Sequence, residues 1–271
     1  PKTNQLGNLV KHLLIIFSVF LFSFISISCT SSSSSSSTTS TDNSTTTGLF
    51  VTVGNTGTIL TSPDGTTWTS RTPGISGFQY LNGVTYGNGL FVTVGYSGTV
   101  LISSDGTSWT KRTSGISVSL NGVTYGNGLF VTVGQFGTIL TSPDGTSWDN
   151  RTSGTSELLN EVTYGNGLFM TVGESGTILT SSDGTSWDNR TSGTSNIIVG
   201  VTYGNELFVI VDEYGTILTS SNGTSWTERT SGTTKYLFGV FYGNGTFVTV
   251  GEWGTILTSS DGTSWDNRTS G

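Results

Sequence analysis

Carboxylates, guanidinium groups and indoles recur along this sequence at a regular spacing. A seven-residue segment, first seen at residues 62–68, occurs six times with a polar residue third and a tryptophan seventh. Carboxylates at such positions could bind Ca²⁺ or act as acid catalysts, but a calcium site needs several oxygens that converge on one point. The third residues of the six copies are Asp64, Asp105, Asp144, Asp183, Asn222 and Asp261.

The fifth copy favours a structural role for these acids. Asn222 keeps the ability to accept backbone N–H groups within its own turn but carries no charge. We therefore expect all six side chains to stabilise their turns, and we predict no metal and no cofactor. The tryptophans, like the phenylalanines that recur with them, are expected to cover a core rather than bind a ligand.

The arginines also share one repeat position, which bears on catalysis. Identical positions on successive repeats form a dispersed ring, whereas a carboxylate clamp needs several arginines at one point. The only histidine is His12 and the only cysteine is Cys29, so the repeats hold no Ser/His/Asp or thiol machinery. We predict that the protein is not an enzyme. The arginines are Arg71, Arg112, Arg151, Arg190, Arg229 and Arg268.

The repeat itself predicts the fold. Units begin at Gly48, Gly89, Gly128, Gly167, Glu206 and Gly245, at a spacing of 41 and then 39 residues. The unit 128–166 contains four strand-like pieces at 129–133, 138–142, 146–152 and 159–164. We interpret Asp-Gly as a tight two-residue hairpin turn between the second and third of these pieces. Four short antiparallel strands per unit of this length predict a β-propeller of about six blades, with a β-solenoid as the rival.

The seven-residue segment, Ser-x-Asp-Gly-x-Ser/Thr-Trp, resembles the Asp-box (BNR) repeat of sialidase-like propellers. In that family a residue commonly stands between Asp and Gly, whereas here the two are adjacent. The whole unit is also similar to repeats of the photosystem II assembly-factor propellers. The resemblance covers residues 48–271.

The Asp-box resemblance also implies where each blade begins. In that family the box joins the third and fourth strands, so the innermost strand is the Val-Thr-Tyr-Gly-Asn piece. Blades then span 81–115, 120–154, 159–193, 198–232 and 237–271, with a first blade at 48–74 that lacks an inner strand. We expect that strand to follow Gly271, which leaves a fragment, a six-blade ring with one imperfect blade, or seven or eight blades as alternatives.

Variation between the repeats is concentrated on one predicted face, the rim. The rim comprises the connection between the second and third strands of each blade and the loop that enters each inner strand. It carries aromatic residues interleaved with acids, which suits stacking on sugars or anchoring a protein partner. The alternative is that loops drift after duplication. The residues are Tyr80, Tyr96, Phe136, Glu157, Glu174, Glu213, Tyr214, Tyr236, Glu252 and Trp253.

The N-terminal part of the sequence predicts where the protein is located in the cell. Two lysines and a histidine precede a short apolar run, which makes residues 1–28 a predicted secretory signal peptide. The end of the run resembles a bacterial lipobox, which implies lipidation of Cys29. Residues 29–47, almost all Ser and Thr, predict a disordered tether.

These features together predict a non-catalytic, monomeric lipoprotein that is lipid-anchored in the cell envelope and binds a protein or a carbohydrate. The formal net charge of −7 disfavours nucleic acid as a partner. The alternative is an assembly or scaffolding factor for a membrane protein complex, as the photosystem-factor resemblance implies. A sialidase-like glycoside hydrolase is the third reading.

Overall fold

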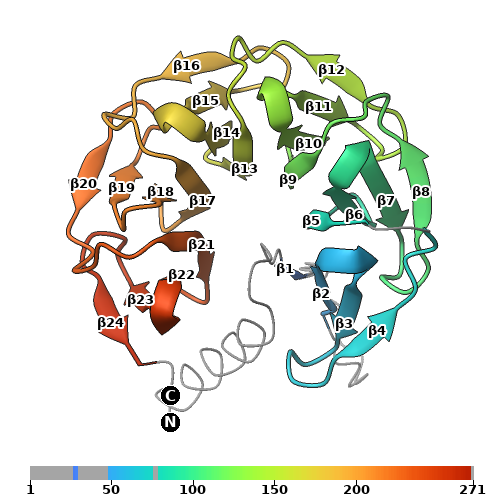
Figure 1. Cartoon of the computed structure of the whole chain (residues 1–271), viewed down its shortest axis with the longest axis horizontal. Helices are drawn as coiled ribbons and strands as arrows, with labels where there is room; N and C mark the ends of the chain where they lie inside the picture. The colour runs from blue at the N-terminus through green and yellow to red at the C-terminus, as the bar shows by residue number, and fades with distance from the viewer. Residues whose placement is uncertain (1–26, 30–47, 76–78, 270–271) are drawn as a thin grey trace, which may run out of the picture.

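The computed structural model describes residues 27–29, 48–75 and 79–269. These residues form six four-stranded antiparallel sheets arranged as the blades of a β-propeller around a central opening (Figure 1). The predicted fold class is thus confirmed, and the five blades predicted after residue 80 are the five sheets observed there. No β-solenoid is formed.

Each blade is a meander in which consecutive strands pair. Blade 1 consists of β1 (Ile27–Cys29), β2 (Phe50–Val53), β3 (Ile59–Ser62) and β4 (Thr69–Arg71). Blade 2 consists of β5 (Leu81–Gly87), β6 (Leu90–Gly95), β7 (Thr99–Ser103) and β8 (Thr110–Thr113). Blade 3 consists of β9 (Leu120–Gly126), β10 (Leu129–Gly134), β11 (Ile139–Ser142) and β12 (Asp149–Arg151).

The second half of the ring repeats this pattern. Blade 4 consists of β13 (Leu159–Gly165), β14 (Leu168–Gly173), β15 (Ile178–Ser181) and β16 (Asp188–Arg190). Blade 5 consists of β17 (Ile198–Gly204), β18 (Leu207–Asp212), β19 (Ile217–Ser220) and β20 (Thr227–Arg229). Blade 6 consists of β21 (Leu237–Gly243), β22 (Thr246–Gly251), β23 (Ile256–Ser259) and β24 (Asp266–Arg268).

The Asp-Gly segment joins two antiparallel strands, as predicted, but not through a two-residue turn. In blade 3 the two-residue turn is Asn-Gly, between β9 and β10, where Asn127 and Gly128 both have positive φ (47° and 77°). In the Asp-Gly segment only Gly145 has positive φ (73°), and six residues separate β11 from β12. The predicted two-residue Asp-Gly hairpin is therefore wrong. The outer strand is also shorter than predicted, since β12 holds three residues.

The hydrophobic cores lie between neighbouring blades and are built from their first, second and third strands. The phenylalanine of the second strand is almost fully buried in blades 2–6, and each such ring stabilises the fold by about 1.5–3 kcal/mol through removal from water. Five of the recurring tryptophans pack against these cores, as predicted. The phenylalanines are Phe91, Phe130, Phe169, Phe208 and Phe247.

The inner strand of blade 1 comes from an unexpected place. β1 pairs with β2 through three residues, with Ile27 opposite Thr52 and Cys29 opposite Phe50. The sequence analysis expected this strand after Gly271 and assigned Ile27 and Ser28 to the end of the leader. Cleavage before Cys29 would remove Ile27 and Ser28, two of the three residues of β1. These two residues cannot both leave with the predicted signal peptide and pair with β2. The rest of the predicted leader and the predicted tether lie outside the described residues.

The described ring is open between blades 6 and 1 (Figure 1). At the four junctions between blades 2 and 6 the inner-strand tyrosine of the next blade covers a glycine, so that a Cβ at Gly87 would lie 2.0 Å from the ring of Tyr125. In blade 6 the corresponding Gly243 has Phe241, from its own strand, as the nearest described neighbour of such a Cβ, at 2.7 Å. A Cβ at Gly239 would meet none of the described residues within 4 Å. Blade 6 therefore ends the stack, and Phe241 fills the place that a neighbouring tyrosine fills elsewhere.

Candidate functional site

The Asp-Gly segments form closed hydrogen-bonded loops. In blade 2 the Asp105 Oδ1 accepts the backbone N–H groups of Thr107 and Ser108 (2.8 and 2.9 Å), and the Ser103 hydroxyl accepts the N–H of Gly106 (2.8 Å). These donors, led by the Ser108 N–H, hold the pKa of Asp105 well below its usual range. Asn222 accepts the corresponding N–H groups in blade 5. The side chain thus serves its own loop whether it is charged or not.

The arginines bind within their own blades. In five blades the Arg Nε donates to a threonine hydroxyl on the third strand, as Arg151 does to Thr141 at 2.9 Å. In blade 2 Ile102 replaces that threonine, and the buried Nε of Arg112 has no hydrogen-bond partner among the described residues. The arginines therefore fasten outer strands and do not converge on a ligand. In blade 5 the buried Nε1 of Trp226 also has no hydrogen-bond partner among the described residues.

The rim turns between second and third strands are rigid and strained. In blade 3 the Gln135 N–H donates to the Ser119 carbonyl (3.0 Å) and the Gly137 N–H donates to the Glu157 carbonyl of the next loop (2.8 Å). The second residue of five of these turns lies in the left-handed region, including Phe136 (φ 56°) and Trp253 (φ 58°). This conformation is unfavourable for a bulky side chain, by roughly 1–2 kcal/mol. Both side chains point into solvent, 73% and 87% exposed.

Blade 5 builds this turn differently. Asp212 replaces the glycine of the other copies, is buried, and accepts the N–H groups of Tyr214 (2.9 Å) and Thr216 (2.7 Å). Its second oxygen accepts the Asn196 amide (2.7 Å). Tyr214 is consequently free of the left-handed conformation and is 61% exposed. The sequence analysis did not predict this role for Asp212.

The structure brings some predicted rim residues together and leaves others apart. Tyr80 and Tyr96 meet edge to face in blade 2, with ring centroids 6.2 Å apart. In blade 6 the Glu252 N–H donates to the Tyr236 carbonyl (2.9 Å), so the turn that carries Trp253 is bonded to the loop that carries Tyr236. Neither Phe136 nor Trp253 makes an aromatic pair among the described residues.

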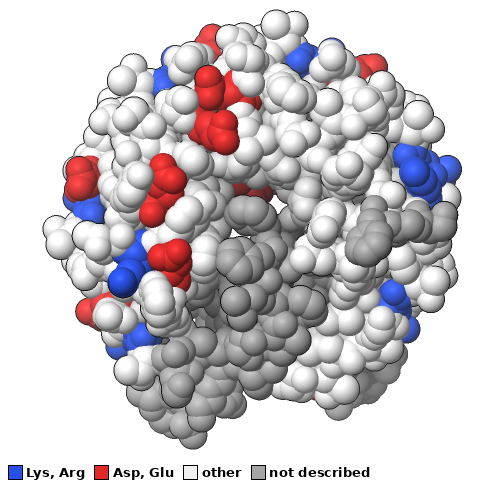
Figure 2. Space-filling model, viewed as in Figure 1, with Lys and Arg blue, Asp and Glu red and all other residues white. Residues whose placement is uncertain are grey.

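Charge separates the two halves of the rim. The first residue of the turn is Asn55, Tyr96 or Gln135 in blades 1–3, but Glu174, Glu213 or Glu252 in blades 4–6. Figure 2 shows the corresponding red atoms gathered over blades 4–6 on this face. Part of this charge is used locally: the Glu213 Oε1 accepts the Ile197 N–H (3.1 Å), a bond that Gln135 makes with the Ser119 N–H in blade 3. The Glu157 Oε2 accepts the hydroxyl of Ser175 (3.0 Å).

Burial and two nearby carboxylates raise the pKa of one rim tyrosine. Burial raises the pKa of Tyr236, and the carboxylates of Glu213 and Glu252 raise it further. Tyr236 therefore stays neutral at physiological pH and lies close to both acids. Two residues that the sequence analysis missed border it. Phe238 stacks on Tyr236 (5.2 Å), and the Nζ of Lys235 lies 5.6 Å from the Trp253 ring centroid. The exchange of Asn82, Asn121 and Asn160 for Phe238 at one repeat position was the available signal.

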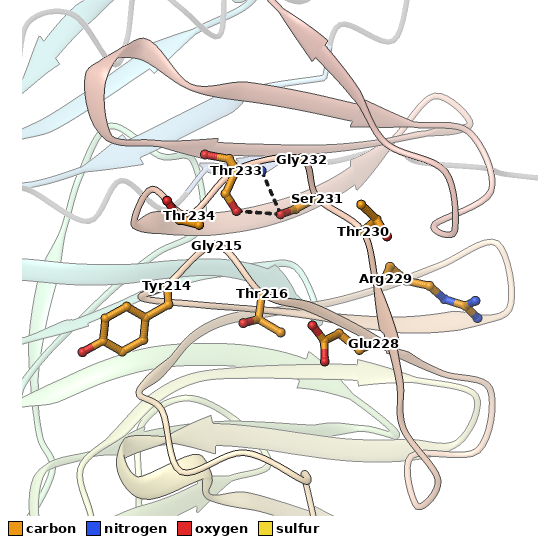
Figure 3. A pocket seen from close by; sticks show the side chains of 10 residues that line it. All are labelled: Tyr214, Gly215, Thr216, Glu228, Arg229, Thr230, Ser231, Gly232, Thr233 and Thr234. Carbon is orange, nitrogen blue, oxygen red and sulfur yellow. Dashed lines mark hydrogen bonds between the residues drawn. The ribbon is translucent and has the colours of Figure 1, made fainter.

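Two surface depressions are repeat features. One of about 480 Å³ lies in blade 5 between Tyr214–Thr216 and the stretch from Glu228 to Thr234 (Figure 3). A similar one, of about 460 Å³, occupies the same place in blade 3 beside Phe136. Their walls are mostly threonine, serine and glycine, and no catalytic pair lines them. A depression repeated at equivalent places follows from the blade shape and marks no single site.

One acid faces the central opening from an inner strand. Glu161 on β13 replaces the glycine of blades 2, 3, 5 and 6, and its carboxylate lies against Gly122 of blade 3. Desolvation raises the pKa of Glu161 to about 7, opposed by one hydrogen bond from the Val162 N–H (3.0 Å). The described residues contain no group of three His, Cys, Asp or Glu side chains placed to hold a metal ion. Among them no helix has the length and hydropathy needed to cross a membrane.

The fold and rim define a six-bladed β-propeller whose variable side chains stand on one face. No protein-family model and no curated protein matches the chain. Among solved structures, one described as "YCF48 bound to D1 peptide" is 20% identical, with a TM-score of 0.65, over 81% of this chain and 76% of that one. YCF48 from Cyanidioschyzon merolae is 17% identical, with a TM-score of 0.59, over 78% of this chain and 79% of that one.

A propeller of another type is equally similar in shape. The WD40 β-propeller domain of Doa1 is 16% identical, with a TM-score of 0.65, over 82% of this chain and 78% of that one. These likenesses establish the fold. The resemblance to Asp-box repeats rests on the loop residues alone, since no family model supports it.

Proposed function

We propose that this chain is a non-catalytic β-propeller that binds a protein partner through its rim. The observation that carries the proposal is the placement of Phe136 and Trp253. Each occupies a left-handed position that is unfavourable for a bulky residue, and each leaves most of its ring in water. Neither feature stabilises the fold. Contact with a molecule outside the chain accounts for both, because exposed aromatic rings are frequent anchors in protein interfaces.

The likeness to the two YCF48 structures supports the alternative form of this proposal, an assembly or scaffolding factor for a membrane protein complex. One of those structures is described as holding a D1 peptide, so that propeller of similar shape binds a polypeptide. The absence of converging acids or arginines among the described residues supports binding rather than hydrolysis. Carbohydrate binding is the competing outcome of the test.

The test replaces rim aromatics without touching the core. A photo-crosslinker next to the rim should capture a defined partner from the native envelope with the wild-type chain, and the variant Tyr214→Ala plus Trp253→Ala should lose that product. Thr66→Ala, an exposed change in an Asp-Gly loop, is the matched control and should retain it. Equal capture by the double variant, or a glycan array signal in place of a protein product, would overturn the proposal.

We further propose that Cys29 is lipidated and anchors the domain in the bacterial cell envelope after export. The position of the only cysteine, directly after the apolar run, supports this. Cys29→Ala should move the protein from the membrane fraction to the soluble fraction, whereas Ser31→Ala should not. Circular dichroism of the released protein separates loss of the lipid from loss of β1. Unchanged membrane partitioning of Cys29→Ala would refute the anchor.

A further inference from the structure

Three aromatic residues lie at the rim of blade 6. The ring centroids of Tyr236 and Phe238 are 5.2 Å apart, and the Nζ of Lys235, the residue before Tyr236, lies 5.6 Å from the Trp253 ring centroid. Trp253 is 87% exposed and Phe238 42% exposed. We call Tyr236, Phe238 and Trp253, together with the flanking Glu213 and Glu252, the blade 6 patch.

Phe238 extends this patch to the open end of the ring. At the same repeat position Asn121 and Asn160 donate their amides to a carbonyl of the next blade, at 2.9 and 2.8 Å. Among the described residues no blade follows blade 6, and an aromatic ring stands where the amide would be. The position has thus lost a contact between blades and gained an apolar surface continuous with the rim.

The charge around the patch selects the partner's chemistry. Glu213 and Glu252 flank Tyr236 closely enough to raise its pKa, and neither takes part in a salt bridge within the described residues. The nearby cation Lys235 lies over the Trp253 ring, 5.6 Å from its centroid. This contact shows that a cation reaches the ring face, which attracts positive charge through its quadrupole.

We propose that the blade 6 patch binds an extended segment of a partner protein that carries Lys or Arg beside apolar residues. The inference rests on the proposed function and names the chemistry of its partner. A basic side chain of the segment replaces Lys235 over Trp253 and lies between the two carboxylates. Its apolar neighbour packs on Tyr236 and Phe238. Lys235 is then an internal competitor for the ring face.

The experiment measures binding of two fluorescein-labelled peptides to the full chain, one alternating Lys with Leu and one alternating Glu with Leu. The Lys peptide should bind, and the Glu peptide should not. Trp253→Ala should weaken Lys-peptide binding about fivefold, through loss of the cation–π contact and of apolar area. Ser97→Ala is the matched control, because it changes the same exposed turn position in blade 2 without removing a ring.

Charge variants sharpen the test. Glu213→Gln plus Glu252→Gln should weaken binding of the Lys peptide about tenfold and make it less sensitive to salt. Glutamine keeps the hydrogen bond that Glu213 makes, as Gln135 shows in blade 3. Lys235→Gln should instead strengthen binding about threefold, because it frees the ring and removes a like charge.

The proposal fails if Ser97→Ala weakens binding as much as Trp253→Ala, if Lys235→Gln weakens it, or if both peptides bind equally. The crosslinking experiment separates this failure from failure of the proposed function. If capture of a protein still depends on Tyr214 and Trp253 while the Lys peptide does not bind, only the partner's chemistry is wrong. If neither peptide nor partner depends on the rim, both proposals fail.

Discussion

The two faces of the propeller show how repetition and variation divide the work of this chain. On one face the Asp-Gly loops recur almost unchanged, and their carboxylates accept backbone N–H groups of the same loop. On the other face the rim turns keep the same backbone but change their side chains from blade to blade, and several of those side chains point into water. A residue that repeats here holds the scaffold, and a residue that departs from the repeat needs its own explanation.

The largest expected effect tests the repeated face. Ser142→Ala removes the hydroxyl that accepts the buried N–H of Gly145, so the free energy of unfolding should fall by about 2 kcal/mol. The corresponding fall in Tm is about 4–8 °C. Ser147→Ala, an exposed residue of the same loop, is the control and should leave Tm nearly unchanged. Equal shifts would mean that the loop hydrogen bonds do not carry the scaffold.

Glu161 tests whether every departure from the repeat serves the rim. Its folded pKa of about 7 lies above the unfolded value, so the folded state holds the extra proton between about pH 4.5 and 7. Stability should therefore decrease as pH rises through this window and level off above it. Glu161→Gln should remove that slope and stabilise the protein by about 2 kcal/mol at pH 8.

The measurement is thermal unfolding at pH 5 and pH 8. Glu228→Gln, at an exposed position on the outer strand, should leave the difference between the two Tm values as it is in the wild type. If Glu161→Gln keeps the wild-type difference, the carboxyl is well solvated and its replacement of glycine carries no cost.

A substitution of Trp253 tests whether the rim side chains serve binding rather than stability. Trp253→Gly should raise the free energy of unfolding by about 1 kcal/mol, because glycine adopts positive φ without strain. The same variant should lose partner binding. Chemical denaturation measures the first effect. A destabilised Trp253→Gly would show that the ring packs on the fold and is not offered to a partner.

The smallest effect concerns the acids of the loops. Hydrogen bonds lower the pKa of Asp261, so the stability that it contributes is present above its unfolded pKa and is lost as pH falls below about 4. Asp261→Asn keeps the acceptor, as Asn222 does, and should differ little from the wild type at pH 7 while unfolding at slightly lower pH. Acid titration monitored by circular dichroism checks this. A large loss at pH 7 would mean that the charge itself is required.

Much of the fold could be predicted because the repeat is regular. The buried faces follow from the recurring Phe and Trp positions, and the blade boundaries follow from the resemblance to Asp-box repeats. The type of the Asp-Gly turn was predicted wrongly because Asp-Gly and Asn-Gly are equivalent signals at the level of sequence. Only Asn127 takes the left-handed conformation, whereas Asp144 turns its side chain onto its own loop. β1 was missed because three residues inside an apolar run carry no strand signal of their own.

The rim could be predicted as a surface but not as a site. Variation identified its residues, yet only the three-dimensional packing showed that Lys235 reaches the Trp253 ring and that Tyr236 pairs with Phe238. Lys235 lies in a variable rim loop but was not selected because only the aromatic residues and acids were, and Phe238 was missed because it lies on the inner strand β21. The role of Asp212 depends on a turn geometry that no other blade shares.

Among the described residues blade 6 packs on blade 5 and no further blade follows it, so the described part of the ring has two ends. A closed propeller must break contacts at two junctions before a blade can leave, whereas an end blade of the described ring is held by described residues at one. Unfolding can therefore proceed inward from blades 1 and 6, as fraying does in linear repeat proteins. Amide hydrogen exchange should then be slowest in blades 3 and 4 and fastest at the ends. The blade 6 patch thus lies on the part of the molecule that opens first, and a bound partner would slow exchange there most.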